Sequence, residues 1–192
     1  MPSVFASTQG DLAISDYLCE TLATAPALVS PTKFHHSVHN AAAGYWTIAT
    51  GALAPYTAVT AYEHTFGAGL LEALSLVESR RGSVLYVAYD IEARGPMAAM
   101  AVSVGLLGTG LVLASEPSER AVAAIDWKIM QRSRARATPA RAQNAALVEG
   151  NALQTCLVVF EALADAAPRT IAQTLGDDVI LELRLDFGIA QR

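Results

Sequence analysis

Charged residues are scarce in this sequence of 192 residues. They make up 16% of the chain, whereas globular domains average roughly 25%. Apolar residues account for 53%, so much of the surface must be covered by something other than charge, and a partner protein is the simplest cover. Basic residues are also few, and the formal net charge of −5 excludes the electrostatic footprint of a nucleic-acid-binding protein.

A long uninterrupted hydrophobic run is absent as well. The most apolar stretch, residues 96–115, is broken by three glycines, whereas a membrane helix needs about 18 or more consecutive apolar residues. Only two cysteines occur, Cys19 and Cys156, each within an apolar stretch, and no positively charged, apolar signal segment opens the chain. These absences favour a cytoplasmic protein with two packed thiols and no membrane span.

Apolar periodicity predicts strands that alternate with helices along a single domain spanning residues 1–192. We expect strands at 2–7, 56–61, 84–89 and 179–185, and helices at 11–23, 33–50, 64–79 and 151–164. The alanine-rich segment 33–50 is expected to be a buried helix that ends at Gly51. Strands that are apolar on both faces and alternate with helices indicate an α/β fold with a mainly parallel sheet covered by helices.

Two further strands are expected at 108–115 and 121–130. Glu116, Pro117 and Ser118 separate them, a spacing suited to an antiparallel hairpin. The fold prediction is therefore a mixed sheet that gains a hairpin.

Two motifs resemble the N-terminal half of a beta-ketoacyl synthase. The first is FHHSVHNAAAGYWTI at 34–48, in which Ser37, Asn40 and Gly44 match a helix of that family. The second is TAVTAYEHTFGAGLLEA at 57–73, which is followed by SVLYVAYD, and GLLGTGLVLASE at 105–116 resembles the start of the family's hairpin. The resemblance implies a thiolase-like half-domain. The motif SVHNAAAGYWTI at 37–48, together with PSVFAS at 2–7 and LVSPTKF at 28–34, is similar to the short ketosynthase-like family found beside genes for aryl polyene and xanthomonadin-type pigments.

The resemblance places Tyr62 where the family has its nucleophilic cysteine, and no later HGT motif supplies the family's histidines. Decarboxylative condensation needs a thiolate to hold the acyl chain and an electrophile to stabilise the enolate. A phenol with a pKa near 10 is a poor acyl carrier at neutral pH. The sequence therefore predicts no catalytic residue and no cofactor.

The residues around this position are interpreted as an inactive site that shapes a tunnel, namely Tyr62, Glu63, His64 and Phe66. Tyr62 is either an ordinary buried tyrosine at a helix start or a tunnel wall. Glu63 opens a helix, where the helix dipole favours a carboxylate, or else it faces a partner.

The segment around the first motif is predicted to be a subunit interface, comprising Phe34, Ser37, His39, Asn40, Gly44 and Trp46. Asn40 is expected to hydrogen-bond to backbone across a contact, because a polar amide in an apolar helix needs a partner. Gly44 lies beside Ala43 and leaves a helix face with almost no side chain, which allows close approach of another element.

An alternative from another functional class uses histidine chemistry. His35 and His39 have the i, i+4 spacing that lets two rings share a metal on one helix face. With Glu63 and His64 they could form a small hydrolase or metal-dependent enzyme, although the helix contains no carboxylate or cysteine ligand. A homodimeric scaffold without an acyl role also remains open.

A polar segment at 131–143 carries four arginines that could dock an acidic acyl carrier protein or form a solvated loop, namely Arg132, Arg134, Arg136 and Arg141. The leading hypothesis is a subunit of chain length factor type that pairs with a full-length ketosynthase as a heterodimer. When alone, the chain could form a homodimer.

Overall fold

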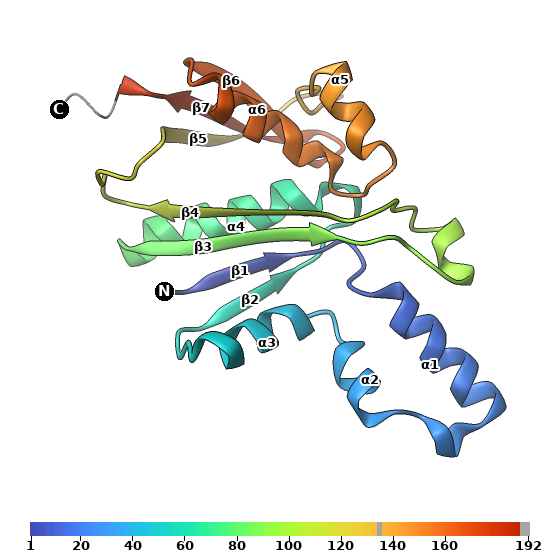
Figure 1. Cartoon of the computed structure of the whole chain (residues 1–192). Coiled ribbons are helices and arrows are strands. Elements are labelled where there is room, and N and C mark those ends of the chain that lie inside the picture. The colour runs from blue at the N-terminus through green and yellow to red at the C-terminus, as the bar shows by residue number, and fades with distance from the viewer. Residues whose placement is uncertain (134–135, 189–192) are drawn as a thin grey trace.

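The computed structural model describes residues 1–133 and 136–188, which form two sheets (Figure 1). The first sheet has the strand order β2-β1-β3-β4 and the second the order β5-β7-β6. The strands of the first sheet are β1 (Ser3–Ala6), β2 (Tyr56–Val59), β3 (Ser83–Asp90) and β4 (Leu107–Ala114). Those of the second are β5 (Ala124–Gln131), β6 (Arg169–Gly176) and β7 (Val179–Asp186).

Helices connect and cover these strands. The α-helices are α1 (Leu12–Thr24), α2 (Pro31–His36), α3 (Ala41–Thr50), α4 (Thr65–Arg80), α5 (Ala142–Ala145) and α6 (Leu157–Asp165). The 3₁₀ helices are η1 (Pro26–Leu28), η2 (Tyr62–His64), η3 (Pro96–Ala99), η4 (Ala146–Val148) and η5 (Gln154–Cys156). None of the helices in the described ranges combines the length and apolar character of a bilayer-crossing segment.

The hydrophobic core lies in a helical layer between the two sheets. Helix α4 contacts β1 and β3 on one side and β6 on the other, and α6 contacts β6. Val4 and Ala6 of β1 point toward this layer, whereas Phe5 points to the opposite face, where its ring lies 6.4 Å from that of Trp46 on α3. Side chains alternate across a strand, so β1 packs against helices on both faces. Because both faces of β1 are covered by helices, Val4, Phe5 and Ala6 form a continuous apolar run that does not alternate with polar residues.

The predicted α/β class is confirmed. Strand β1 pairs in parallel with both β2 and β3, and β4 adds an antiparallel edge. The buried parallel strands are those that the sequence predicted from continuous apolar runs.

The predicted hairpin between 108–115 and 121–130 is wrong. Strand β4 pairs with β3, and β5 pairs with β7 in the other sheet. Leu113 of β4 belongs to the core on one side of the helical layer, and Trp127 of β5 packs against that core from the second sheet. Because each strand buries its apolar face against this layer, the intervening turn crosses between sheets.

The predicted single buried helix at 33–50 is also wrong. The segment forms α2 and α3, which are separated by four residues, and only Ala43 of α3 is buried. Ser37 Oγ donates to the Phe34 carbonyl at 2.8 Å. Such local side-chain bonds compete with helix continuation, so α2 ends there. The large apolar side chains of this segment, among them Phe34, Tyr45 and Ile48, are exposed in the single chain.

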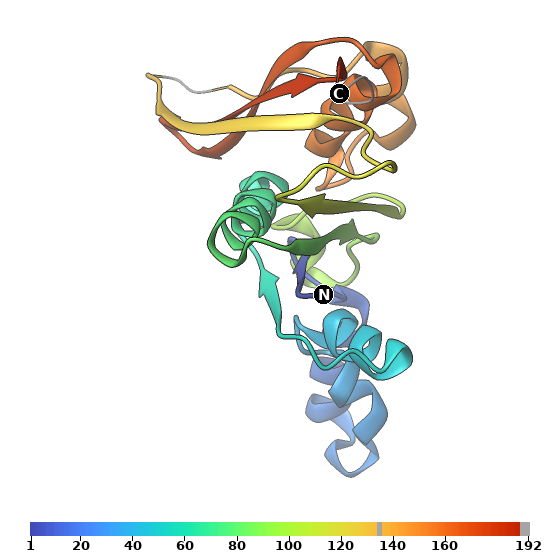
Figure 2. The ribbon, with the colours of Figure 1, turned by 90° about the vertical axis from the view of Figure 1, so that its left-hand side faces the viewer.

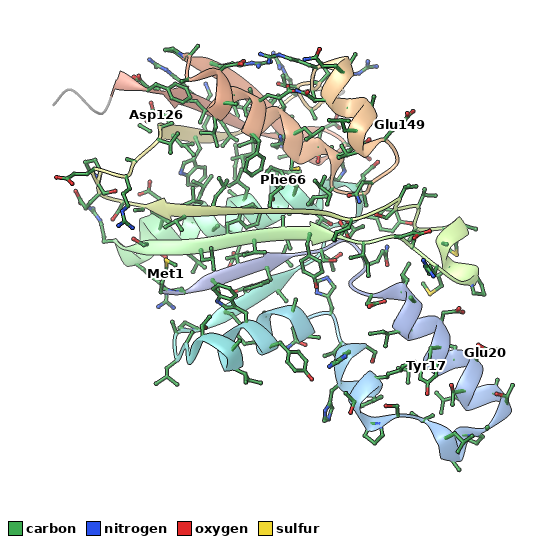
Figure 3. The ribbon with its side chains drawn as sticks, in the orientation of Figure 1. Met1, Tyr17, Glu20, Phe66, Asp126 and Glu149 are labelled. Carbon is green, nitrogen blue, oxygen red and sulfur yellow. The ribbon has the colours of Figure 1, made fainter. Side chains whose placement is uncertain are left out.

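The outer face of the second sheet is charged. Lys128 of β5 and Glu182 of β7 are cross-strand partners, and their side chains form an ion pair of 2.9 Å. Asp126, which is labelled on β5 in Figure 3, pairs with Arg184 in the same register. Their strand neighbours Trp127 and Leu183 face the core. The face that carries these four charged residues is therefore the solvent-facing side of the sheet.

A stability prediction follows from the end of α6. Ala166 ends that helix with φ 49°, in the left-handed region. A β-carbon is strained there by roughly 1–2 kcal/mol, so Ala166→Gly is expected to raise the free energy of unfolding by about 0.5–1 kcal/mol. Ala164→Gly, at an exposed position inside the same helix, is the matched control and is expected to lower it by about 0.5–1 kcal/mol. Chemical denaturation measures both changes in the free energy of unfolding. If the two changes had the same sign, Ala166 would not be strained.

Candidate functional site

The turn that follows β2 is strained. Tyr62 has φ 55°, a left-handed conformation that non-glycine residues rarely adopt. Thr65 stabilises the turn, because its hydroxyl donates to the Tyr62 carbonyl at 2.6 Å and accepts from the Ala61 amide at 3.0 Å. Strain of this kind persists only where surrounding contacts enforce it, and it is common at functional sites. The strand-to-helix turn is therefore the first candidate site.

The Tyr62 side chain is not buried, which corrects the first of its two interpretations. It is 62% exposed, and its hydroxyl donates to the Met100 carbonyl at 3.2 Å. The bond ties the turn to the segment beyond η3. Tyr62 is therefore a surface residue. Its role as the wall of a tunnel stays a prediction.

A cavity of about 640 Å³ lies beside this turn. Its wall is made by the end of β1, the Tyr62 turn, residues 100–102, residues 150–155 and the end of β6. Its polar lining residues include Thr8, Tyr62, Glu63, His64, Arg136, Asn151 and Thr174. Gly67 lets β6 come this close, because a β-carbon there would lie 2.7 Å from the Thr174 carbonyl oxygen. Segments that are far apart in sequence thus meet at one site.

Glu63 and His64 both line the cavity. His64 Nδ1 is 3.0 Å from the Thr174 hydroxyl, and His64 Nε2 is 3.8 Å from a Glu63 carboxylate oxygen. Glu63 lies in the first turn of η2, and its side chain is 76% exposed. His64 thus joins the turn to the second sheet, whereas the Glu63 carboxylate extends toward solvent.

Phe66 does not line the cavity, which corrects its placement among the tunnel residues. It is 1% exposed, and its ring lies 5.6 Å from that of Tyr86. The Tyr86 hydroxyl donates to the Phe66 carbonyl at 2.7 Å. Figure 3 shows Phe66 in the layer between the two sheets. Phe66 lies on α4 only two residues after His64, about half a helical turn, so its side chain points away from the cavity and into the core.

The sequence did not reveal the buried carboxylate that holds Thr8, one of the cavity-lining residues. Asp90, at the end of β3, is buried and accepts hydrogen bonds from the Ser7 hydroxyl at 3.0 Å and from the amide and hydroxyl of Thr8. Burial raises the pKa of the Asp90 carboxyl, and the hydrogen bonds from Thr8 and Ser7 oppose that shift. The only available sequence signal was an aspartate at the end of a buried strand.

Asn151 is a second residue that the sequence did not reveal. It is buried at the cavity, and its amide donates to the Val104 carbonyl at 2.9 Å and to the Asp90 carbonyl at 3.4 Å. Its carbonyl oxygen accepts from the Leu153 amide at 2.9 Å. Asn151 therefore fixes three chain segments around the cavity.

An apolar groove of about 300 Å³ forms between α2, α3 and β2. It is lined by Phe34, His35, Val38, Asn40, Ala41, Gly44, Tyr45, Ile48 and Tyr56, and Ile48 is 77% exposed. Three residues of the predicted interface, Phe34, Asn40 and Gly44, line this groove.

The polar contacts in the groove differ from those expected. The Asn40 amide donates to the Tyr56 hydroxyl at 3.1 Å and not to backbone, because α3 begins just after Asn40. At Gly44 the same hydroxyl lies 4.0 Å from the position of a β-carbon, which is an ordinary contact distance. The close approach of another element at Gly44 therefore stays a prediction.

The other predicted interface residues lie around the groove. His39 Nε2 is 2.7 Å from the Ser7 carbonyl oxygen, and the Ser37 hydroxyl donates to the Phe34 carbonyl. Trp46 is partly exposed and packs over Phe5. Beside them, β2 is an outer strand of its sheet. An outer strand presents unpaired backbone groups that another chain can bind.

The four residues of the alternative histidine site do not lie together in the structure. His35 lines the groove, His39 bonds to Ser7, and Glu63 with His64 lines the cavity. Helix α2 ends at His36, so His35 and His39 share no helix face. Across residues 1–133 and 136–188, no group of three or more His, Cys, Asp or Glu side chains is placed to hold a metal ion.

The arginines of the segment 131–143 have different surroundings. Arg136 lines the cavity and Arg132 is exposed. The Arg141 guanidinium pairs with Asp165, whose pKa this hydrogen bond lowers. Arg134 lies outside the described residues.

Neither cysteine is placed for acyl transfer. Cys19 on α1 is exposed, contrary to the expectation of a packed thiol, and Cys156 is buried. Burial raises the pKa of the Cys156 thiol to about 12. Neither residue lines the cavity beside Tyr62.

The family model for the N-terminal domain of beta-ketoacyl synthases matches residues 1–170. The chain belongs to this family. No curated protein matches the chain.

Two solved structures share the fold of this beta-ketoacyl synthase family member. One is a ketosynthase, ApeO, in complex with its chain length factor, ApeC, from Xenorhabdus doucetiae, with a TM-score of 0.70 and 21% identity over 95% of this chain and 68% of that one. The other is the ishigamide ketosynthase/chain length factor, with a TM-score of 0.65 and 19% identity over 97% of this chain and 72% of that one. The predicted thiolase-like architecture is thereby confirmed.

Proposed function

We propose that this chain is a subunit of chain length factor type, without turnover of its own, that pairs with an active beta-ketoacyl synthase in polyketide-type biosynthesis. The observation that carries the proposal is Tyr62, which occupies the strained turn with a phenol while both thiols lie elsewhere. A condensing enzyme needs a nucleophile that can carry the acyl chain at this point. The chain keeps the surrounding architecture and lacks that group.

The α2–α3 groove and the outer strand β2 support a subunit contact. Exposed apolar side chains gather in the groove, and Tyr56 of β2 forms part of its wall. Contiguous apolar surface beside an unpaired strand is typical of a protein interface. The two similar structures are described as ketosynthase and chain length factor assemblies, which agrees with this proposal.

The pathway and the carrier protein are further parts of the proposal. The resemblance favours aryl polyene pigment synthesis in the cytoplasm. Arg136, at the rim of the cavity, and the exposed Arg132 are the residues we assign to an acidic acyl carrier protein, since complementary charge speeds association. Arg141 is excluded from this role because Asp165 neutralises it.

The test is co-expression with the ketosynthase encoded nearest to this chain, followed by size-exclusion chromatography with mass detection. A stable one-to-one heterodimer is expected. Ile48→Asp, in the groove, is expected to weaken the complex strongly, because a buried unpaired charge is costly. Leu147→Asp is the matched control, since Leu147 is similarly exposed on η4. A well-folded chain that ignores the ketosynthase would overturn the proposal.

Shortening Tyr62 is expected to alter product length. In a reconstituted pair, Tyr62→Ala removes the wall between the turn and Met100, so the main product should become longer. Tyr62→Phe is the control, because it keeps the ring and loses only the hydrogen bond. Mass spectrometry of the released acyl chains measures both, and an unchanged profile with Tyr62→Ala would contradict a tunnel at this position.

A further inference from the structure

A helical arm projects from the body of the molecule. We define the arm as α1, η1 and α2, residues 12–36. Figures 1 and 2 both show these elements standing off from the two sheets. The main contacts of α1 are with α2, η1 and η3, and only Leu12 and Leu18 of its side chains are buried. The arm therefore has very little core of its own.

Contacts within the arm nonetheless fix its shape. The Lys33 ammonium lies 3.5 Å from the centre of the Tyr17 ring and joins α2 to α1. The Ser30 hydroxyl accepts from the Lys33 amide at 3.3 Å and caps α2. At the base, Asp16 packs so closely against Gly95 that a β-carbon there would lie 2.3 Å from its carboxyl carbon. An arm ordered before binding loses less conformational entropy on association.

The arm exposes large apolar side chains. Leu22 near the end of α1 is 58% exposed, Leu28 on η1 is 73% exposed and Phe34 on α2 is 58% exposed. Phe34 also lines the α2–α3 groove, so the apolar surface of the arm continues into it. Isolated apolar residues on a surface are ordinary, whereas several on one small element beside an apolar groove indicate a binding surface.

The size of a stable interface argues in the same direction. A specific heterodimer buries roughly 20–30 residues on each side. The groove alone is lined by nine residues. The groove by itself is therefore too small for a stable complex, and the arm supplies adjoining surface of the same apolar character.

We propose that the arm clasps the ketosynthase subunit, burying Leu22 and Leu28 against an apolar surface of that subunit beyond the groove. This inference rests on the proposed function, because it names the subunit that the arm holds. The clasp adds affinity through surface outside the cavity and the groove.

Affinity measurements on the full chain test the clasp. The double variant Leu22→Asp with Leu28→Asp is expected to raise the Kd for the co-expressed ketosynthase by about 30-fold or more, as for the loss of buried anchor residues. Leu147→Asp, at an exposed apolar position outside the arm, is expected to leave the Kd unchanged. All three side chains are exposed in the single chain, so the variants should fold, and circular dichroism checks this.

Hydrogen exchange on the wild-type complex provides a second readout. Amides of α1 and η1 are expected to exchange more slowly when the ketosynthase is bound. Unchanged Kd and unchanged exchange in the arm, with the wild-type complex intact and Ile48→Asp disruptive, would overturn the clasp and leave the proposed function standing. Absence of any wild-type complex would overturn both.

Discussion

Phe66→Ala is expected to lower the free energy of unfolding by about 3–5 kcal/mol. The ring is almost fully buried against Tyr86, so its removal leaves a cavity between the two sheets in addition to the lost apolar burial. The Tyr86 hydroxyl, which donates to the Phe66 carbonyl, holds that side chain in place and limits collapse into the space. Urea denaturation followed by circular dichroism measures the loss.

Phe34→Ala is the matched control, because Phe34 is well exposed on α2. Its free energy of unfolding should change by less than about 1 kcal/mol. If Phe66→Ala instead left stability intact and changed the product length in a reconstituted pair, Phe66 would belong to a tunnel and the core assignment would be wrong.

Gly69→Ala is expected to be the second most damaging change. A β-carbon at Gly69 would lie 2.7 Å from the Ala6 β-carbon and 2.9 Å from Tyr86 Cε2. Ala6 can move only with the backbone of β1, and Tyr86 is fixed by its hydrogen bond, so α4 must shift away from the sheet. Overpacking of this kind costs about 1–3 kcal/mol, and sometimes more.

Gly110→Ala provides the comparison for Gly69. Its nearest contact would be the Tyr86 carbonyl oxygen at 3.8 Å, an ordinary distance, and the position is exposed on β4. The free energy of unfolding should stay within about 0.5 kcal/mol of wild type. Equal losses at Gly69 and Gly110 in thermal or urea denaturation would contradict close packing of α4 on β1.

The sequence predicted the strands that can be recognised from their own apolar residues. Strand β1 is buried on both faces, and β3 alternates buried with partly buried residues, so their apolar runs predicted them correctly. Strand β6 was missed because Gln173 interrupts its apolar face. That residue is buried and donates to the Thr155 carbonyl at 3.1 Å, a partner that no local pattern reveals.

The candidate site was predictable only in part, for the same reason. The turn at Tyr62 was found through its resemblance to a known motif. The contacts that build the cavity around it join distant segments: His64 meets Thr174, and Asp90 meets Asn151. Such pairings depend on how β6 and the residues after Val148 fold back, which apolar periodicity does not encode.

The way in which the Tyr62 turn is held has an evolutionary consequence. Thr65 enforces the turn through the Tyr62 carbonyl and the Ala61 amide, and neither bond uses the side chain at position 62. A change of the side chain at position 62 leaves both of these bonds in place, so the chemical character of this position can change during evolution while the turn keeps them.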